Sequence, residues 1–94
     1  MQLLSSAGNG NGSTFFIERL FDRSKDQFFT CFVSGTFDGG TVTLEISPNG
    51  GTTWFQTGVS LTAAGAQNVE FRANAVRGVV SGGGASVSIN MLLI

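Results

Sequence analysis

The sequence lacks histidine altogether, and it has only one cysteine and one tryptophan among its 94 residues. Without histidine, the most common general base and a frequent metal ligand are both missing. Cys31 has no second cysteine with which to form a disulfide, and it lies between Thr30 and Phe32 without a neighbouring base. We therefore expect Cys31 to be a buried structural thiol, and we expect no bound metal and no cofactor.

Charge is scarce as well. Charged residues make up 12% of the chain, which is about half the usual share for a soluble domain. The five basic residues form no stripe that could follow a nucleic-acid backbone, and the net charge is −1. Surface charge opposes association between proteins, so a surface with so few charged residues associates more readily. This composition is typical of a protein that other subunits cover.

Chemical motifs are also missing. The six acidic residues show no local spacing typical of a glycosidase carboxylate pair or of a calcium loop. The glycine-rich segments lack the Lys-Ser/Thr of a phosphate loop. No apolar run is long enough to span a bilayer, and the first residues lack the basic region of a secretory signal. We expect a protein that is not an enzyme and that binds no nucleic acid, membrane or small-molecule substrate.

A two-residue period of apolar and polar side chains runs through most of the chain. Strands are predicted over residues 13–21, 28–37, 41–47, 52–57, 68–73, 75–82 and 85–94. Short strands separated by regular turns predict an all-β fold, a small antiparallel β-sandwich (Ig-like or jelly-roll-like) of about seven strands. We assign residues 1–12 to an N-terminal arm and residues 13–94 to a single β-sandwich domain.

Three local features refine this prediction. Segment 28–37 carries Phe28 and Phe32 on one face and Cys31 and Val33 on the other, so we expect a central strand covered on both faces. The sequences "DGG" at 38–40 and "GGG" at 82–84 predict turns, the first of them a hairpin. Gly78, inside a strand, indicates a bulge or a close-packing point.

The stretch "SPNGGTTW" at 47–54 contains the strongest turn signal. Pro48 fixes φ at the entry, Asn49 tolerates a left-handed φ, and Gly50 and Gly51 adopt one freely. We therefore predict a structural turn with Trp54 packed near its base. An exposed Trp54 that stacks on a sugar is the alternative.

This stretch also resembles the Asp-box, the Ser-x-Asp-x-Gly-x-Thr-Trp hairpin motif of sialidases and other β proteins, with Asn49 at the position of the Asp. The resemblance implies a rigid hairpin whose polar side chains bond the turn backbone, with the aromatic ring packed beneath. It does not imply sialidase activity, because the box is a folding element in those proteins.

Both ends of the sequence are apolar and are candidates for an assembly interface. The chain closes on "NMLLI", and an exposed apolar edge of this kind is prone to pairing. The predicted assembly contacts are Leu3, Leu4, Met91, Leu92, Leu93 and Ile94. The alternative is that these side chains belong to the core of the chain itself, because a strand alternates between core and surface.

Residues 34–90 carry a wider resemblance. The segments "SGTFDGGTVTLEISPNGGTTWFQ", "SLTAAGAQNVEF" and "VRGVVSGGGASVSI" are similar to small structural proteins of tailed bacteriophages. The shared elements are the Gly-Thr-Phe-x-Gly-Gly-Thr-Val-Thr-Leu hairpin, the Pro-Asx-Gly-Gly-Thr-Thr-Trp turn, the Leu-Thr-Ala-x-Gly connector and the Val-Arg-x-Val-Val strand. The resemblance implies a β-sandwich component of a virion.

Within that class we expect a capsid decoration (cement) protein that clamps neighbouring capsid subunits. Its partners would be the major capsid protein and further copies of itself, as a homotrimer. It would be made in the cytoplasm of the bacterial host and lie on the capsid surface. The alternative is a tail, head–tail junction or fibre component that binds a receptor or glycan.

Overall fold

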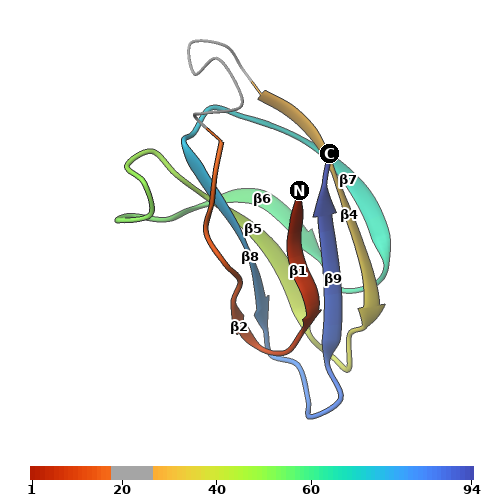
Figure 1. The fold of residues 1–94 in the computed structure, drawn as a ribbon. Coiled ribbons are helices and arrows are strands. Elements are labelled where there is room, and N and C mark those ends of the chain that lie inside the picture. Colours follow the sequence, from red (N-terminus) through yellow and green to blue (C-terminus); the bar gives the residue numbers. More distant parts are fainter. Residues whose placement is uncertain (18–26) are drawn as a thin grey trace.

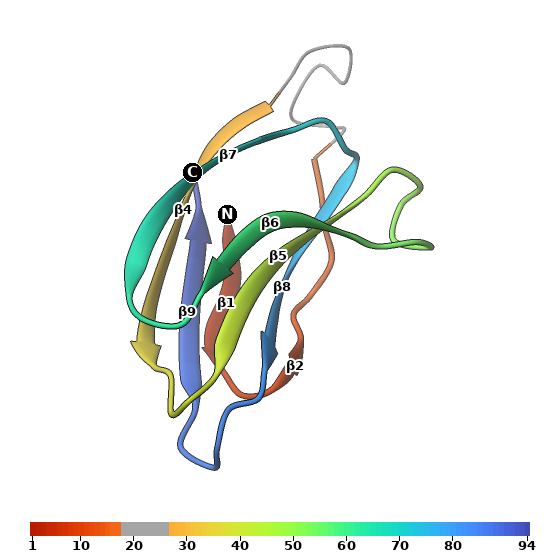
Figure 2. The same ribbon diagram turned by 180° about the vertical axis from the view of Figure 1, so that it is seen from behind.

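Two antiparallel β-sheets packed face to face make up the computed structural model, which describes residues 1–17 and 27–94 (Figures 1 and 2). The predicted all-β sandwich is confirmed, with nine described strands instead of about seven. The strands are β1 (Gln2–Ala7), β2 (Gly10–Asn11), β3 (Phe15–Phe16), β4 (Gln27–Thr36), β5 (Thr41–Ser47), β6 (Phe55–Leu61), β7 (Gly65–Phe71), β8 (Ala75–Ser81) and β9 (Ser88–Leu93). The predicted strand 13–21 falls partly on residues 18–26, which lie outside the described residues.

The strands divide between a four-stranded sheet and a five-stranded sheet. Sheet A has the order β1-β9-β4-β7, and sheet B has the order β2-β8-β5-β6, with β3 also paired to β8. Among the described strands, only β5 and β6 are both consecutive in the chain and paired with each other. The loop of this hairpin projects away from the two sheets (Figure 1).

The other predicted turns form but do not make hairpins. At "DGG", Asp38 and Gly39 have φ values of 46° and 79°, and the Gly40 N–H donates to the Phe37 carbonyl at 2.7 Å. However, β4 lies in sheet A and β5 in sheet B, so the hairpin prediction is wrong. The turn at 82–84 likewise leads from β8 in sheet B to β9 in sheet A. Turn residues set the local reversal of the chain but not the sheet that the next strand joins.

Residues 1–12, which we expected to form an arm outside the sandwich, supply β1 to sheet A and β2 to sheet B. Leu3 and Leu4 are both 3% exposed, although consecutive strand residues normally point to opposite faces. A register shift between Gln2 and Leu4 in the pairing with β9 accounts for this, because a bulge turns an extra side chain inward. The N-terminal segment is therefore an integral part of the core.

The core lies between the sheets and follows the predicted alternation. Val42 and Leu44 of β5 and Ile89 and Met91 of β9 are fully buried. Ile46 is partly buried against the same cluster. These side chains alternate with exposed or half-exposed polar ones, as a sheet with one covered face requires.

Gly78 is a close-packing point between the sheets. A Cβ atom at this position would lie 2.9 Å from Leu4 Cγ and 2.9 Å from Met91 Sδ, both in sheet A. The backbone of β8 therefore approaches sheet A more closely than any side chain would permit. The sequence prediction of a bulge or close contact at Gly78 is confirmed as a close contact.

Strand β4 is covered on one face only, which corrects the prediction of a strand covered twice. Phe29, Cys31 and Val33 point into the core, and the Phe29 ring stacks on another core ring at 5.3 Å. Phe28 is 74% exposed and Phe32 is 45% exposed on the opposite face. Both faces of β4 carry apolar side chains, but only the face that points into the core is buried.

We expect Gly78→Ala to lower the free energy of unfolding by about 1–3 kcal/mol, because the added methyl group overpacks the contact with Leu4 and Met91. Urea denaturation followed by Trp54 fluorescence measures this. Gly8→Ala is the matched control, because no atom lies within 4 Å of its Cβ position, and we expect a change below about 0.5 kcal/mol. Equal stability of Gly78→Ala and the unmodified protein would contradict the close approach.

Candidate functional site

The structure separates the six predicted assembly residues into two groups. Leu3, Leu4, Met91 and Leu93 are between 0% and 3% exposed and belong to the core of the chain itself. This corrects the prediction for these four, whose side chains cannot reach a second molecule. Leu92 is half-buried, and Ile94 is 67% exposed. Alternation along β9 explains the division, because Met91 and Leu93 point inward and their neighbours point outward.

The outward-pointing residues meet two phenylalanines of β4. Phe32 lies directly opposite Leu92 in the pairing of β4 with β9. Ile94 lies opposite Thr30, with which it exchanges two main-chain hydrogen bonds of 2.8 and 3.0 Å. Phe28 and Phe32 flank Thr30 on the same exposed side of β4. We call the set Phe28, Phe32, Leu92 and Ile94 the apolar face of sheet A.

A shallow groove of about 450 Å³ lies beside this face, lined in part by Phe28, Thr30 and Ile94. Its polar wall is formed by Asn68 and Glu70 of β7, and the Thr30 hydroxyl donates a 2.8 Å hydrogen bond to Asn68 Oδ1. The side chains of all four members of the apolar face are uncharged. Sequence analysis missed Phe28 and Phe32 as surface residues, although they alternate with the core residues of the same strand.

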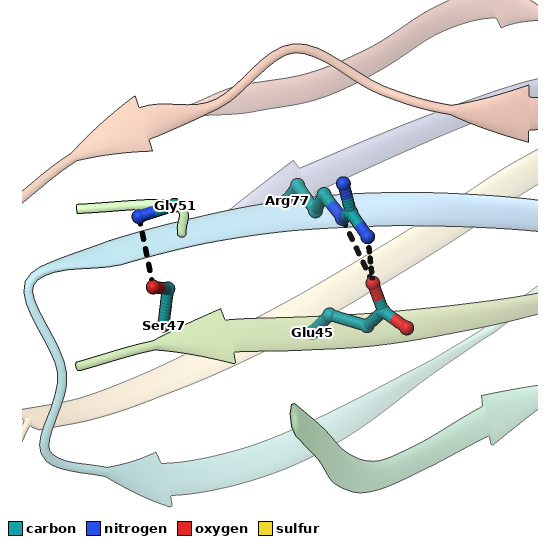
Figure 3. A network of polar contacts seen from close by, with 4 residues as sticks. All are labelled: Glu45, Ser47, Gly51 and Arg77. Atoms are coloured by element: carbon teal, nitrogen blue, oxygen red, sulfur yellow. Dashed lines mark hydrogen bonds and ion pairs between the residues drawn. The ribbon is translucent and has the colours of Figure 1, made fainter. Parts of the chain in front are cut away.

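The outer face of sheet B has a different chemistry. The Arg77 guanidinium of β8 makes contacts of 2.7 and 2.8 Å with Glu45 Oε1 of β5 (Figure 3). Arg77 Cζ also lies 4.2 Å from the centre of the Trp54 ring, in cation–π geometry. One face of Trp54 is therefore occupied by a side chain of the same molecule. This arrangement disfavours Trp54 as a platform for a sugar.

The turn after β5 is held by the buried Ser47 hydroxyl. It donates to Asn49 Oδ1 at 2.8 Å and accepts the Gly51 N–H at 2.8 Å (Figure 3 shows the latter bond). Asn49 Oδ1 also accepts the Thr53 N–H at 2.9 Å. Gly50 and Gly51 have φ values of 74° and 101°, which glycine adopts without strain.

The predicted turn residues thus have the geometry that the Asp-box resemblance implies. Polar side chains bond the turn backbone, and a Cβ at Gly51 would lie 3.4 Å from Trp54 Cζ2. Pro48 is exposed at the entry, and Asn49 supplies the oxygen acceptor that Asp supplies in the motif.

Cys31 is fully buried in β4, as predicted for a structural thiol. Burial raises the pKa of the thiol from 9.0 to about 11. Within residues 1–17 and 27–94, no three His, Cys, Asp or Glu side chains gather closely enough to hold a metal ion. The same residues contain no helix with the length and apolarity needed to cross a bilayer.

Comparisons with protein-family models, with curated proteins and with solved structures found no match to this chain.

We expect Ser47→Ala to lower the free energy of unfolding by about 1–2 kcal/mol, because the Gly51 N–H and Asn49 lose their buried partner. Asn49→Asp should stay near the unmodified protein, since a carboxylate oxygen can accept the same bonds. Ser60→Ala, at an exposed strand position, is the control. Urea denaturation of the three variants tests this, and equal stability of Ser47→Ala and Ser60→Ala would refute the role of the hydroxyl.

The raised pKa of Cys31 makes stability depend on pH. Between pH 9 and about 11 the thiol ionises in the unfolded chain before it ionises in the folded one, so folding stability falls as the pH rises through this interval. We expect the loss to reach at most about 3 kcal/mol. Denaturant midpoints measured across this range should fall more steeply for the unmodified protein than for Cys31→Ala. Parallel curves would show that Cys31 ionises equally in both states.

Proposed function

We propose that this chain is a structural protein of a bacteriophage virion, and within that class a capsid decoration protein that clamps neighbouring capsid subunits. The observation that carries the proposal is the apolar face of sheet A. It exposes Phe28 to 74%, Ile94 to 67% and Phe32 to 45%. Aromatic and aliphatic side chains gathered in this way are typical of a surface that binds another protein.

The size of the apolar face fits a role that depends on many copies. Burying one large apolar side chain contributes about 1.5–3 kcal/mol, whereas association costs about 4–15 kcal/mol in lost freedom of motion. The four side chains therefore support a modest affinity for one subunit. A clamp that contacts two capsid subunits gains from its second contact through effective concentration. Such a role is mechanical, and it uses no catalytic group, metal or cofactor.

The sequence resemblance supplies the biological setting of this proposal. The resembling segments contain the loop of the β5–β6 hairpin and the turns at 38–40 and 82–84. They therefore shape the sandwich that presents the apolar face. The protein would be made in the host cytoplasm and then lie on the capsid surface, with the major capsid protein as its partner. A tail or fibre role remains the competing proposal, although the Arg77 contact on Trp54 gives it no support from a glycan platform.

The test uses virions from a phage strain from which the gene is deleted. Purified protein is added back, and imaging locates a label on the particles. We expect regular density over the head. Phe28→Ser together with Phe32→Ser should weaken binding to the particles at least about tenfold, because the two rings lose their contact area.

Phe55→Ser is the matched control, because Phe55 is 55% exposed on β6 of sheet B, and we expect binding within about twofold of the unmodified protein. All three substituted side chains are exposed, so folding is retained and circular dichroism verifies it. Density confined to the tail would replace the decoration role with the tail role. Unchanged binding of the double variant would exclude the apolar face as the contact.

A further inference from the structure

A β-sandwich can also associate through the edge strands of its sheets. The longer edge strands of this molecule are β1, β6 and β7, and they differ in how regularly they pair with their neighbours. β1 has two register shifts against β9, and Ser6 has a φ of 48°. β6 has a register shift against β5, and Gly58 has a φ of 96°. Bulges of this kind twist an edge and hinder pairing with another strand. β7 pairs with β4 over seven consecutive residues without a shift.

The hydrogen bonds of sheet A determine which groups of β7 face outward. The main-chain groups of Thr30 bond to Ile94 and so point toward β9. In an antiparallel sheet the next residues point the other way, so Phe29 and Cys31 bond to β7. Their partners there are Val69 and Gln67. The main-chain groups of the intervening residues, Ala66, Asn68 and Glu70, therefore face the open edge.

This edge is accessible. In the part of the chain that the structure describes, β7 pairs with β4 alone. Ala66, Asn68 and Glu70 are all exposed. The strand forms the outer margin of sheet A in both ribbon views, at the right in Figure 1 and at the left in Figure 2.

We propose that the β7 edge pairs with β7 of a second copy of this chain, antiparallel and about a two-fold axis at Asn68. In this register Asn68 lies opposite Asn68 of the second copy, and Glu70 lies opposite Ala66. The outward-facing main-chain N–H and C=O groups of Ala66, Asn68 and Glu70 in both copies then form hydrogen bonds between the two strands. The pairing places no like charges opposite each other, because Glu70 is the only charged residue of the strand.

Other two-fold registers of the same edge either pair fewer of the outward-facing main-chain groups or set like charges opposite each other. Axes at Gln67 and Val69 place Glu70 opposite residue 64 and Ala66 opposite residue 72, and both of these residues lie outside β7. An axis at Glu70 sets the two Glu70 carboxylates opposite each other, which destabilises a strand pair. An axis at Ala66 leaves Glu70 of each strand without a partner strand, because β7 begins at Gly65. The Asn68 register is therefore the one in which hydrogen bonding and charge agree.

This pairing does not rest on the proposed function. It would join the two A sheets edge to edge and leave the apolar face of each copy uncovered. A two-fold pair also differs from the homotrimer that we expected on the sequence resemblance. The mass of the assembly in solution distinguishes the two.

Sedimentation equilibrium of the purified full chain provides the first measurement. We expect a mass of twice 9.8 kDa, and a monomer for Asn68→Pro, because proline removes a main-chain donor that faces outward and spares the bonds to β4. Asn68→Ser, which keeps that donor, is the control and should remain a dimer. A monomeric unmodified protein at its highest soluble concentration, or a trimer, overturns the proposal.

A charge pair tests the register without relying on proline. Ala66→Glu places a glutamate opposite Glu70 at two symmetric positions, whereas Ala66→Lys places a lysine there. Both side chains are exposed, so both variants should fold alike, as circular dichroism can verify. We expect dimerisation of Ala66→Lys to be about tenfold tighter than that of Ala66→Glu. Equal dissociation constants would overturn the Asn68 register, whether or not the protein binds capsids.

Discussion

Each sheet of this sandwich depends on the other for its stability, because the chain changes sheet at almost every connection. Only β5 and β6 form a local hairpin among the described strands. The other paired strands are not consecutive in the chain, and the core between the two sheets holds them together. In this core Leu4 and Met91 of sheet A pack closely against the backbone of Gly78 in sheet B. Neither sheet would persist alone, since isolated strands rarely bury enough apolar surface to offset the entropy lost on ordering them.

This shared core leaves two outer faces, and they have different chemistries. Sheet B presents an ion pair between Glu45 and Arg77, with Trp54 stacked against the guanidinium, so its polar and aromatic groups satisfy one another. Sheet A presents Phe28, Phe32 and Ile94 as exposed apolar side chains. Sheet B also exposes Phe16 and Phe55, but on strands β3 and β6 at its two sides, whereas Phe28, Phe32 and Ile94 lie on the neighbouring strands β4 and β9 or at their ends.

Local chemistry made part of the structure predictable from the sequence. Alternation gave the inward face of β5, and the Ser-Pro-Asn-Gly-Gly stretch gave a turn whose bonds Ser47 and Asn49 complete. The inward position of Met91 and Leu93 on β9 was not predicted, because an apolar strand at the end of a sequence fits an interface as well as a core. Sheet membership was not predictable, because the Asp38–Gly40 turn reverses the chain equally well within a sheet or between sheets. Phe28 resembled a core residue for a related reason, since a sequence does not show whether a second layer covers an apolar face. The burial of both Leu3 and Leu4 depends on a bulge that only the pairing with β9 produces.

The position of β9 has a consequence for how the protein is made. This strand lies between β1 and β4 in sheet A, yet it follows every other strand in the chain. During synthesis, β1 and β4 emerge from the ribosome long before the strand that joins them. Contacts between such distant segments form slowly, because a long loop must close first. The nascent chain therefore carries an unpaired β1 until β9 has emerged from the ribosome, and its exposure to chaperones and to aggregation is greatest in that interval.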